Sequence, residues 1–162
     1  MIVRLSKTVL VAAVAFFNTL VVFNNLTDYG TNYNFVHHVL LMDSTFPGNH
    51  GMGRAIHAQW IHVAFYDGII AWEAATAVLL WAGSLQLFRG IKQPAAVFHN
   101  AKGVAIGGLT VGLLLWLVAF LTIGGEWFLM WQSATWNGEE TAFRMFAIMA
   151  LVLLYLAMPE GE

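Results

Sequence analysis

Long apolar runs separated by short polar segments dominate the chain. Four runs have the length and character of membrane-spanning helices, at residues 8–23, 64–88, 104–123 and 142–158. A helix needs roughly 20 mostly apolar residues to cross about 30 Å of hydrocarbon. The second run is the least regular because it contains Asp67 and Glu73, but its length and its apolar stretch over residues 69–81 favour spanning. The pattern predicts an all-α polytopic membrane protein with four transmembrane helices in a single domain, residues 1–162.

The connections between the runs carry their own signals. Residues 24–63 form a long loop, and long loops usually carry structure or function. Within it, the apolar positions of residues 35–42 suit a short interfacial helix lying on the membrane surface. The second connection, residues 124–141, places Trp127, Trp131 and Trp136 where an apolar helix meets the lipid headgroups. We expect this Trp-rich turn to anchor spans three and four.

The basic residues set the expected orientation. With four spans drawn, one side carries five of the seven lysines and arginines: Arg4, Lys7, Arg89, Lys92 and Lys102. The other side carries Arg54 and Arg144. Cytoplasmic loops are enriched in Lys and Arg, so we expect both termini in the cytoplasm and the loops 24–63 and 124–141 outside. No small-residue cleavage pattern follows the first apolar run, which we therefore interpret as a retained span.

Composition narrows the function classes. Hydrophobic residues make up 59% of the chain and charged residues 10%, whereas a soluble domain carries about 25% charged residues. The chain has no cysteine, which excludes disulfides, iron–sulfur clusters and thiolate metal sites within it. The net charge of −2 and the lack of a basic patch argue against a nucleic-acid partner. The lipid bilayer is the expected environment.

Histidines gather in and beside the first loop. Imidazole is the commonest metal ligand, and the candidates for a Zn or Cu site are His37, His38, Asp43, His50 and His57. Adjacent histidines on a helix point about 100° apart, so this spacing favours interfacial hydrogen-bonding roles over a metal site. No histidine lies deep in a span, and His62 and His99 belong near opposite faces, so we expect neither haem nor another resident cofactor.

Glu73 is the most informative polar residue, because a carboxylate in a membrane span is costly and usually faces the bundle interior. At 100° per residue, His62, Tyr66 and Glu73 share one face of their helix. Asn18 of the first span is a possible partner. This polar seam has two interpretations: a hydrogen bond that fixes helix register, which we favour, or a cofactor-binding, ligand-binding or proton-handling site.

Two further groups have structural interpretations. Glu126 ends the third run and Arg144 begins the fourth, so the two are expected to pair as a clamp across the Trp-rich turn. Glycines recur along the third run at intervals that let helix backbones approach closely in lipid. That face, Gly103, Gly107, Gly108 and Gly112, is expected to pack within the chain or against another membrane subunit.

Several blocks of the sequence resemble a bacterial family described only as predicted small integral membrane proteins of unknown function. The blocks are residues 24–29, 35–43, 45–47, 124–133, 136–138 and 142–144, and the resemblance extends over nearly the whole chain. It implies a bacterial inner-membrane protein with four spans. It implies no activity and transfers no functional residue.

Three functions remain in competition. We favour a non-catalytic accessory or structural subunit of a larger membrane complex of respiratory, photosynthetic or oxidase type, because glycine-lined packing surface is present and no catalytic constellation is evident. The alternative is a protein that handles an ion, a metal or a quinone, using Glu73 and the loop histidines. An enzyme with its site around Glu126, Trp127 and Gln132 ranks last.

Overall fold

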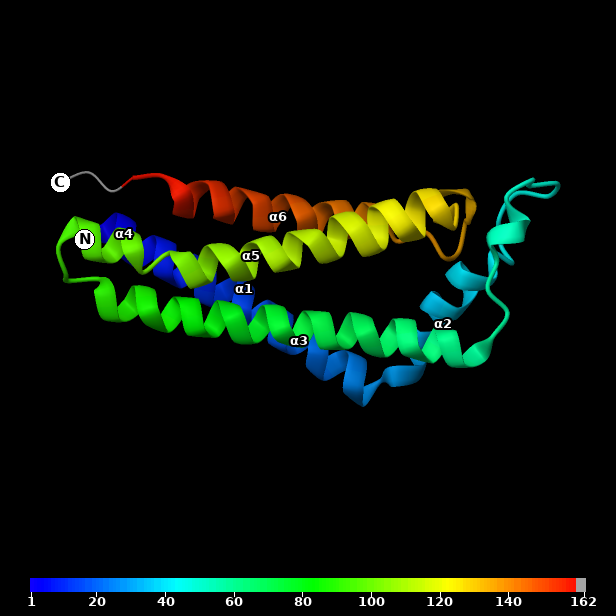
Figure 1. Ribbon diagram of the computed structural model, residues 1–162, viewed down its shortest axis with the longest axis horizontal. Helices are drawn as coiled ribbons and strands as arrows, with labels where there is room; N and C mark the ends of the chain where they lie inside the picture. Colours follow the sequence, from blue (N-terminus) through cyan, green and yellow to red (C-terminus); the bar gives the residue numbers. More distant parts are fainter. Residues whose placement is uncertain (160–162) are drawn as a thin grey trace.

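The computed structural model describes residues 1–159 as an elongated bundle of helices (Figure 1). Residues 160–162, the end of the expected single domain, lie outside the described residues. The helices are α1 (Ile2–Thr27), α2 (Tyr29–Leu41), α3 (Gln59–Gly90), α4 (Ala95–Asn100), α5 (Gly103–Leu114) and α6 (Glu139–Ala157). Two short 3-10 turns, η1 (Met52–Arg54) and η3 (Met130–Gln132), and a π-helix, η2 (Leu115–Trp127), complete the fold.

Four helical segments are long and apolar enough to cross a membrane: Ile2–Thr27, Gln59–Gly90, Ala95–Trp127 and Glu139–Ala157. The first three apolar runs identified in the sequence lie within the first three segments, and the fourth run, residues 142–158, extends one residue beyond the fourth segment. Within residues 1–159 the structure contains no strand, and the short helix expected in the first loop is present as α2. The all-α fold with four candidate spans is therefore confirmed.

The two ends of the bundle are formed by different elements. The start of α1, the end of α6 and the short helix α4 lie together at one end, which we call the α4 end (Figure 1). The opposite end, the α2 end, carries α2 and the two long connections. At the α4 end the ammonium groups of Lys7 and Lys102, both 1% exposed, donate to the carbonyl of Met158. These bonds tie α1 and the start of α5 to the end of α6.

Small residues allow the spanning helices to approach closely. A Cβ added to Gly83 of α3 would lie 2.6 Å from both the backbone N and the Cα of Ala105 in α5. A Cβ on Gly112 would lie 2.7 Å from Met149 Sδ of α6 and 3.0 Å from Thr76 Cγ2 of α3. The contact at Gly83 is with backbone atoms and leaves no room for a side chain, whereas at Gly112 the flexible end of Met149 would have to move. Such close approach of helix backbones is typical of packing in lipid.

The glycine face expected for a partner divides into two parts. Gly108 and Gly112 are covered by the chain itself, because added Cβ atoms there would contact Leu80, Thr76 or Met149. Added Cβ atoms on Gly103 and Gly107 would meet nothing within 4 Å. Packing within the chain, one of the two roles expected for this face, is therefore found at Gly108 and Gly112, and Gly103 and Gly107 leave surface that the chain does not cover.

The second half of span three is a π-helix, which the sequence did not reveal. Its 13 residues form hydrogen bonds five residues apart; Phe128 N, for example, donates to Ile123 O at 3.0 Å. π-Helices occur mostly as single turns and often at functional sites. Trp116 and Phe120 of this helix line a cavity together with residues of α1, α2 and α3.

Candidate functional site

A cavity of about 430 Å³ lies at the α2 end of the bundle. It is enclosed by α1, α2, α3, η2 and residues 135–141. Small-molecule sites typically measure about 300–1,000 Å³, so the cavity is large enough for a ligand. Its wall includes Asn25, Asn32, Tyr66, Glu73, Trp116 and Trp136.

Glu73 forms part of the cavity wall and is fixed by a chain of amides. Its side chain is 2% exposed, and its Oε2 accepts a hydrogen bond from Asn25 Nδ2 at 2.6 Å. Asn32 Nδ2 donates in turn to Asn25 Oδ1 at 2.6 Å, and Tyr66 OH donates to the Asn25 carbonyl at 3.4 Å. These bonds connect α1, α2 and α3 at one point in the bundle.

The partner of Glu73 is therefore Asn25 rather than Asn18, the candidate from the sequence. Asn18 is also buried, but its Nδ2 donates to Val14 O of the same helix at 2.8 Å. Asn25 lies two helical turns closer to the α2 end, at the height where Glu73 faces α1. The sequence identified Glu73 as the polar residue in the span. Its partner depends on how far α1 and α3 are shifted along each other, which the sequence does not show.

Aromatic side chains make up much of the remaining wall: Phe35, Tyr66, Trp116, Phe120 and Trp136. The rings of Trp116 and Phe120, one turn apart on η2, have centroids 4.8 Å apart. Within residues 1–159 the buried indole nitrogen of Trp116 has no hydrogen-bond partner. The sequence showed these aromatic residues as span and turn residues, with no signal that they converge.

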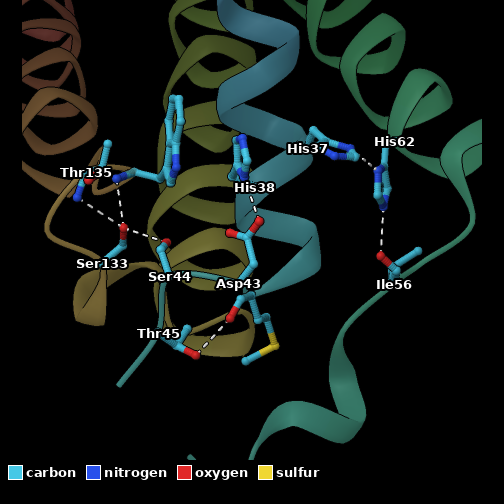
Figure 2. Close-up of polar contacts among 11 residues, drawn as sticks. His37, His38, Asp43, Ser44, Thr45, Ile56, His62, Ser133 and Thr135 are labelled. Carbon is cyan, nitrogen blue, oxygen red and sulfur yellow. Dashed lines mark hydrogen bonds and ion pairs between the residues drawn. The ribbon is translucent and has the colours of Figure 1, made fainter. Parts of the chain in front are cut away.

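The expected face of His62, Tyr66 and Glu73 is buried as a unit, but its members have different surroundings. Tyr66 and Glu73 line the cavity, whereas His62 contacts α2 and the loop before α3. His62 Nε2 lies 2.8 Å from the carbonyl of Ile56, and His62 Nδ1 lies 2.8 Å from His37 Nδ1 (Figure 2). A carbonyl only accepts, so a neutral His62 donates from Nε2 and accepts from His37 at Nδ1.

The surroundings of His37 favour its neutral form over its protonated form. Burial, followed by the neighbouring His62 and His38, lowers the pKa of His37 from its ordinary value of 6.5, and Asp43 opposes this shift. As the pH falls, His37 is therefore protonated near pH 6.5 in the unfolded chain and only at a lower pH in the folded protein. The contribution of His37 to stability is fully present above pH 6.5 and is lost progressively as the pH falls below it.

This linkage gives a testable pH dependence. We expect the melting temperature of the detergent-solubilised protein to fall between about pH 7 and pH 5, the range in which an ordinary imidazole gains its proton. The variant His37→Phe keeps a ring at this position and should show a smaller acid-dependent fall. The control His57→Phe changes an exposed histidine and should behave like the unmodified protein. An equal fall in all three proteins would contradict the assignment.

His38 packs against Trp136, one of the residues that line the cavity. Its Nδ1 lies 2.7 Å from Asp43 Oδ2, which orients the ring (Figure 2). The same ring stacks on Trp136, with centroids 4.5 Å apart and planes 9° apart. Because Trp136 lines the cavity, the His38–Asp43 pair connects the first loop to the shape of the site.

The metal candidates are only partly brought together. His37, His38 and Asp43 lie close to one another, while His50 and His57 are exposed elsewhere in the loop. Across the described part of the chain, no group of three or more His, Cys, Asp or Glu side chains is arranged to hold a metal ion. The adjacent histidines are instead engaged with different partners, as their spacing on a helix suggests.

Hydrogen bonds connect the Trp-rich turn to the first loop. Ser133 Oγ accepts a hydrogen bond from Ser44 Oγ at 2.8 Å (Figure 2). Gln132 Oε1 accepts from Phe46 N at 3.1 Å. Arg54 donates to the Trp127 carbonyl at 3.1 Å and lies over the Trp127 ring. These contacts position residues 135–141, which form one side of the cavity mouth.

The arginine of the expected clamp has a different partner. Arg144 pairs with Glu140, one turn earlier on α6, at 3.2 Å, and not with Glu126. Pairs four residues apart on a helix surface are natural neighbours. Glu126 instead lies beside Glu139 and Glu140, at the edge of a separate hollow near the start of α6.

Comparison with known proteins agrees with this architecture. A family model described as "Predicted small integral membrane protein (DUF2165)" matches residues 3–159. No curated protein and no solved structure matches the chain. Because the family match extends over nearly the whole sequence, the chain belongs to this family of small integral membrane proteins, whose description names no activity.

Proposed function

We propose that this integral membrane protein binds a small molecule in the cavity at the α2 end, with Glu73 as its polar anchor. The observation that carries the proposal is the Glu73 carboxyl group, 2% exposed on a membrane-spanning helix and forming part of the wall of a cavity of about 430 Å³. Ionisable groups in spans are costly and mark ligand or ion pathways. The proposal assigns no catalytic residue, metal or haem.

The mouth of the cavity suggests the direction of entry. Exposed polar residues of α2, of the turn before α6 and of the first turn of α6 form it: Thr31, Asn32, Thr135, Asn137 and Thr141. A ligand would enter from the aqueous side at the α2 end and pass Asn32 on its way to Glu73. The excess of lysine and arginine near the α4 end supports placing the α2 end on the non-cytoplasmic side. We propose a bacterial inner membrane as the location.

A cavity-filling variant tests the proposal. Val21 of α1 lines the cavity, whereas its neighbour Leu20 is exposed on the lipid-facing side. We expect native mass spectrometry of protein from its own membranes to detect a bound small molecule in the unmodified protein and in Leu20→Trp. Val21→Trp should lose it, because the indole occupies the cavity. Identical spectra from the two tryptophan variants would contradict the proposal.

A second candidate is the accessory subunit of a larger membrane complex. It is favoured by the open surface at Gly103 and Gly107, where another helix has room to approach. The same native spectra separate the two functions, because they also report bound protein subunits. A partner subunit that is lost in Gly107→Leu but kept in Val21→Trp would support this second function.

A further inference from the structure

We infer that the ligand of this cavity is a small organic cation carrying an ammonium group. The inference rests on the proposed binding function and adds the chemical class of the ligand. Two independent features of the wall carry it: its charge and its aromatic rings.

The cavity wall has one acidic side chain and no basic side chain among its lining residues. Among the lining residues, Glu73 is the only aspartate, glutamate, lysine, arginine or histidine. Its hydrogen bond comes from the neutral amide of Asn25. A buried carboxylate without a basic partner is unfavourable in a medium of low dielectric constant. A ligand with one positive charge supplies the missing partner, whereas an anionic ligand would be repelled with nothing to offset the repulsion.

The aromatic rings of the wall also favour a positively charged ligand. Five aromatic side chains line the cavity, among them Trp116, Trp136 and Tyr66. The face of an aromatic ring attracts an ammonium group within about 6 Å, most strongly for Trp, and aromatic cages are a recurring way of binding quaternary ammonium ions. Stacking against His38 at 4.5 Å fixes the Trp136 ring before any ligand arrives. The Trp136 ring is therefore already positioned in the wall.

Size and coordination argue against a metal ion in this position. Hard cations such as Ca²⁺ take six to eight oxygen ligands at about 2.3–2.6 Å, and the wall offers one carboxylate, with the remaining polar groups being neutral amides and hydroxyls contributed by separate segments of the chain. A cavity of about 430 Å³ instead leaves room for an ammonium group with several carbon substituents. The geometry fits a bulky, weakly hydrated cation.

Choline and its neutral isostere, in which a quaternary carbon replaces the nitrogen, provide a direct test. We expect equilibrium dialysis with the purified protein to show that choline binds more tightly than the isostere, since only choline carries the charge. Glu73→Gln should weaken choline binding at least about tenfold, a change equivalent to about 1.4 kcal/mol. Glu140→Gln, which alters an exposed glutamate on α6, should leave the affinity unchanged.

The aromatic contribution is tested with a second pair of variants. Trp136→Leu should weaken choline binding, and Trp136→Phe should retain most of it. This pair, and the comparison of the two ligands on the unmodified protein, remain informative if Glu73→Gln fails to fold. Equal binding of choline and the isostere would overturn the cationic ligand and leave the proposed cavity function standing. If the protein bound neither choline nor the isostere, the cationic ligand would also be overturned. The proposed cavity function would then be decided separately, by whether native mass spectrometry detects a bound small molecule.

Discussion

Gly83→Ala is expected to destabilise the bundle by about 1–3 kcal/mol, the range found when a close-packed core is forced to take an extra carbon. The new Cβ would lie 2.6 Å from the backbone N and Cα of Ala105. Backbone atoms cannot rotate away as a flexible side chain does. The crossing of α3 and α5 must therefore open, which also disturbs the neighbouring contacts of Leu80 and Leu109, both fully buried in the core.

Gly107→Ala is the matched control for this change. Gly107 also lies within a spanning helix, but a Cβ there would meet nothing within 4 Å. Because alanine is the better helix former, the control should be neutral or slightly stabilising. Unfolding by SDS titration in mixed micelles measures both variants against the unmodified protein. Equal stability of Gly83→Ala and Gly107→Ala would show that the α3–α5 crossing is looser than the structure indicates.

The contrast between these glycines shows how far sequence reasoning extends. Four-residue spacing identified a face of span three on which backbones approach closely, and Gly108 and Gly112 do contact other helices of the chain. The spacing gave no reason to separate them from Gly103 and Gly107. It also missed Gly83, which has no second glycine four residues away on α3. Which glycine meets a backbone depends on the crossing point of two helices, and hydropathy contains no such information.

The same limit applies to the candidate site. Hydropathy singled out Glu73 because a carboxyl group interrupts an apolar run, and helical periodicity correctly placed His62 and Tyr66 on its buried face. Neither pattern could show that η2 winds as a π-helix, or that its Trp116 lines the same cavity as Glu73. Nor could they find the contact between His37 and His62, since it joins residues from two elements whose relative position is set by the fold.

The second large effect is expected when Glu73 loses its partner. Asn25→Leu removes the amide that donates to Glu73 Oε2 at 2.6 Å and also accepts from Asn32. Leaving a buried polar group without its partner costs about 1–3 kcal/mol, and more when the group is charged. We therefore expect Asn25→Leu to lower the free energy of unfolding by at least that amount, measured by the same SDS titration.

The double variant Asn25→Leu with Glu73→Met decides whether the loss comes from this bond. Replacing both partners with apolar groups of similar shape is often nearly neutral, so the double variant should recover much of the stability lost in Asn25→Leu. The coupling energy from the complete cycle, with Glu73→Met as the second single variant, is expected at about 0.5–3 kcal/mol for residues in contact. Asn18→Leu is the matched control, because Asn18 is buried on the same helix but its side chain donates to Val14 O of that helix and not to Glu73. If Glu73→Met fails to rescue Asn25→Leu, or rescues Asn18→Leu equally well, the amide would have a packing role and the Glu73 anchor would lose its support.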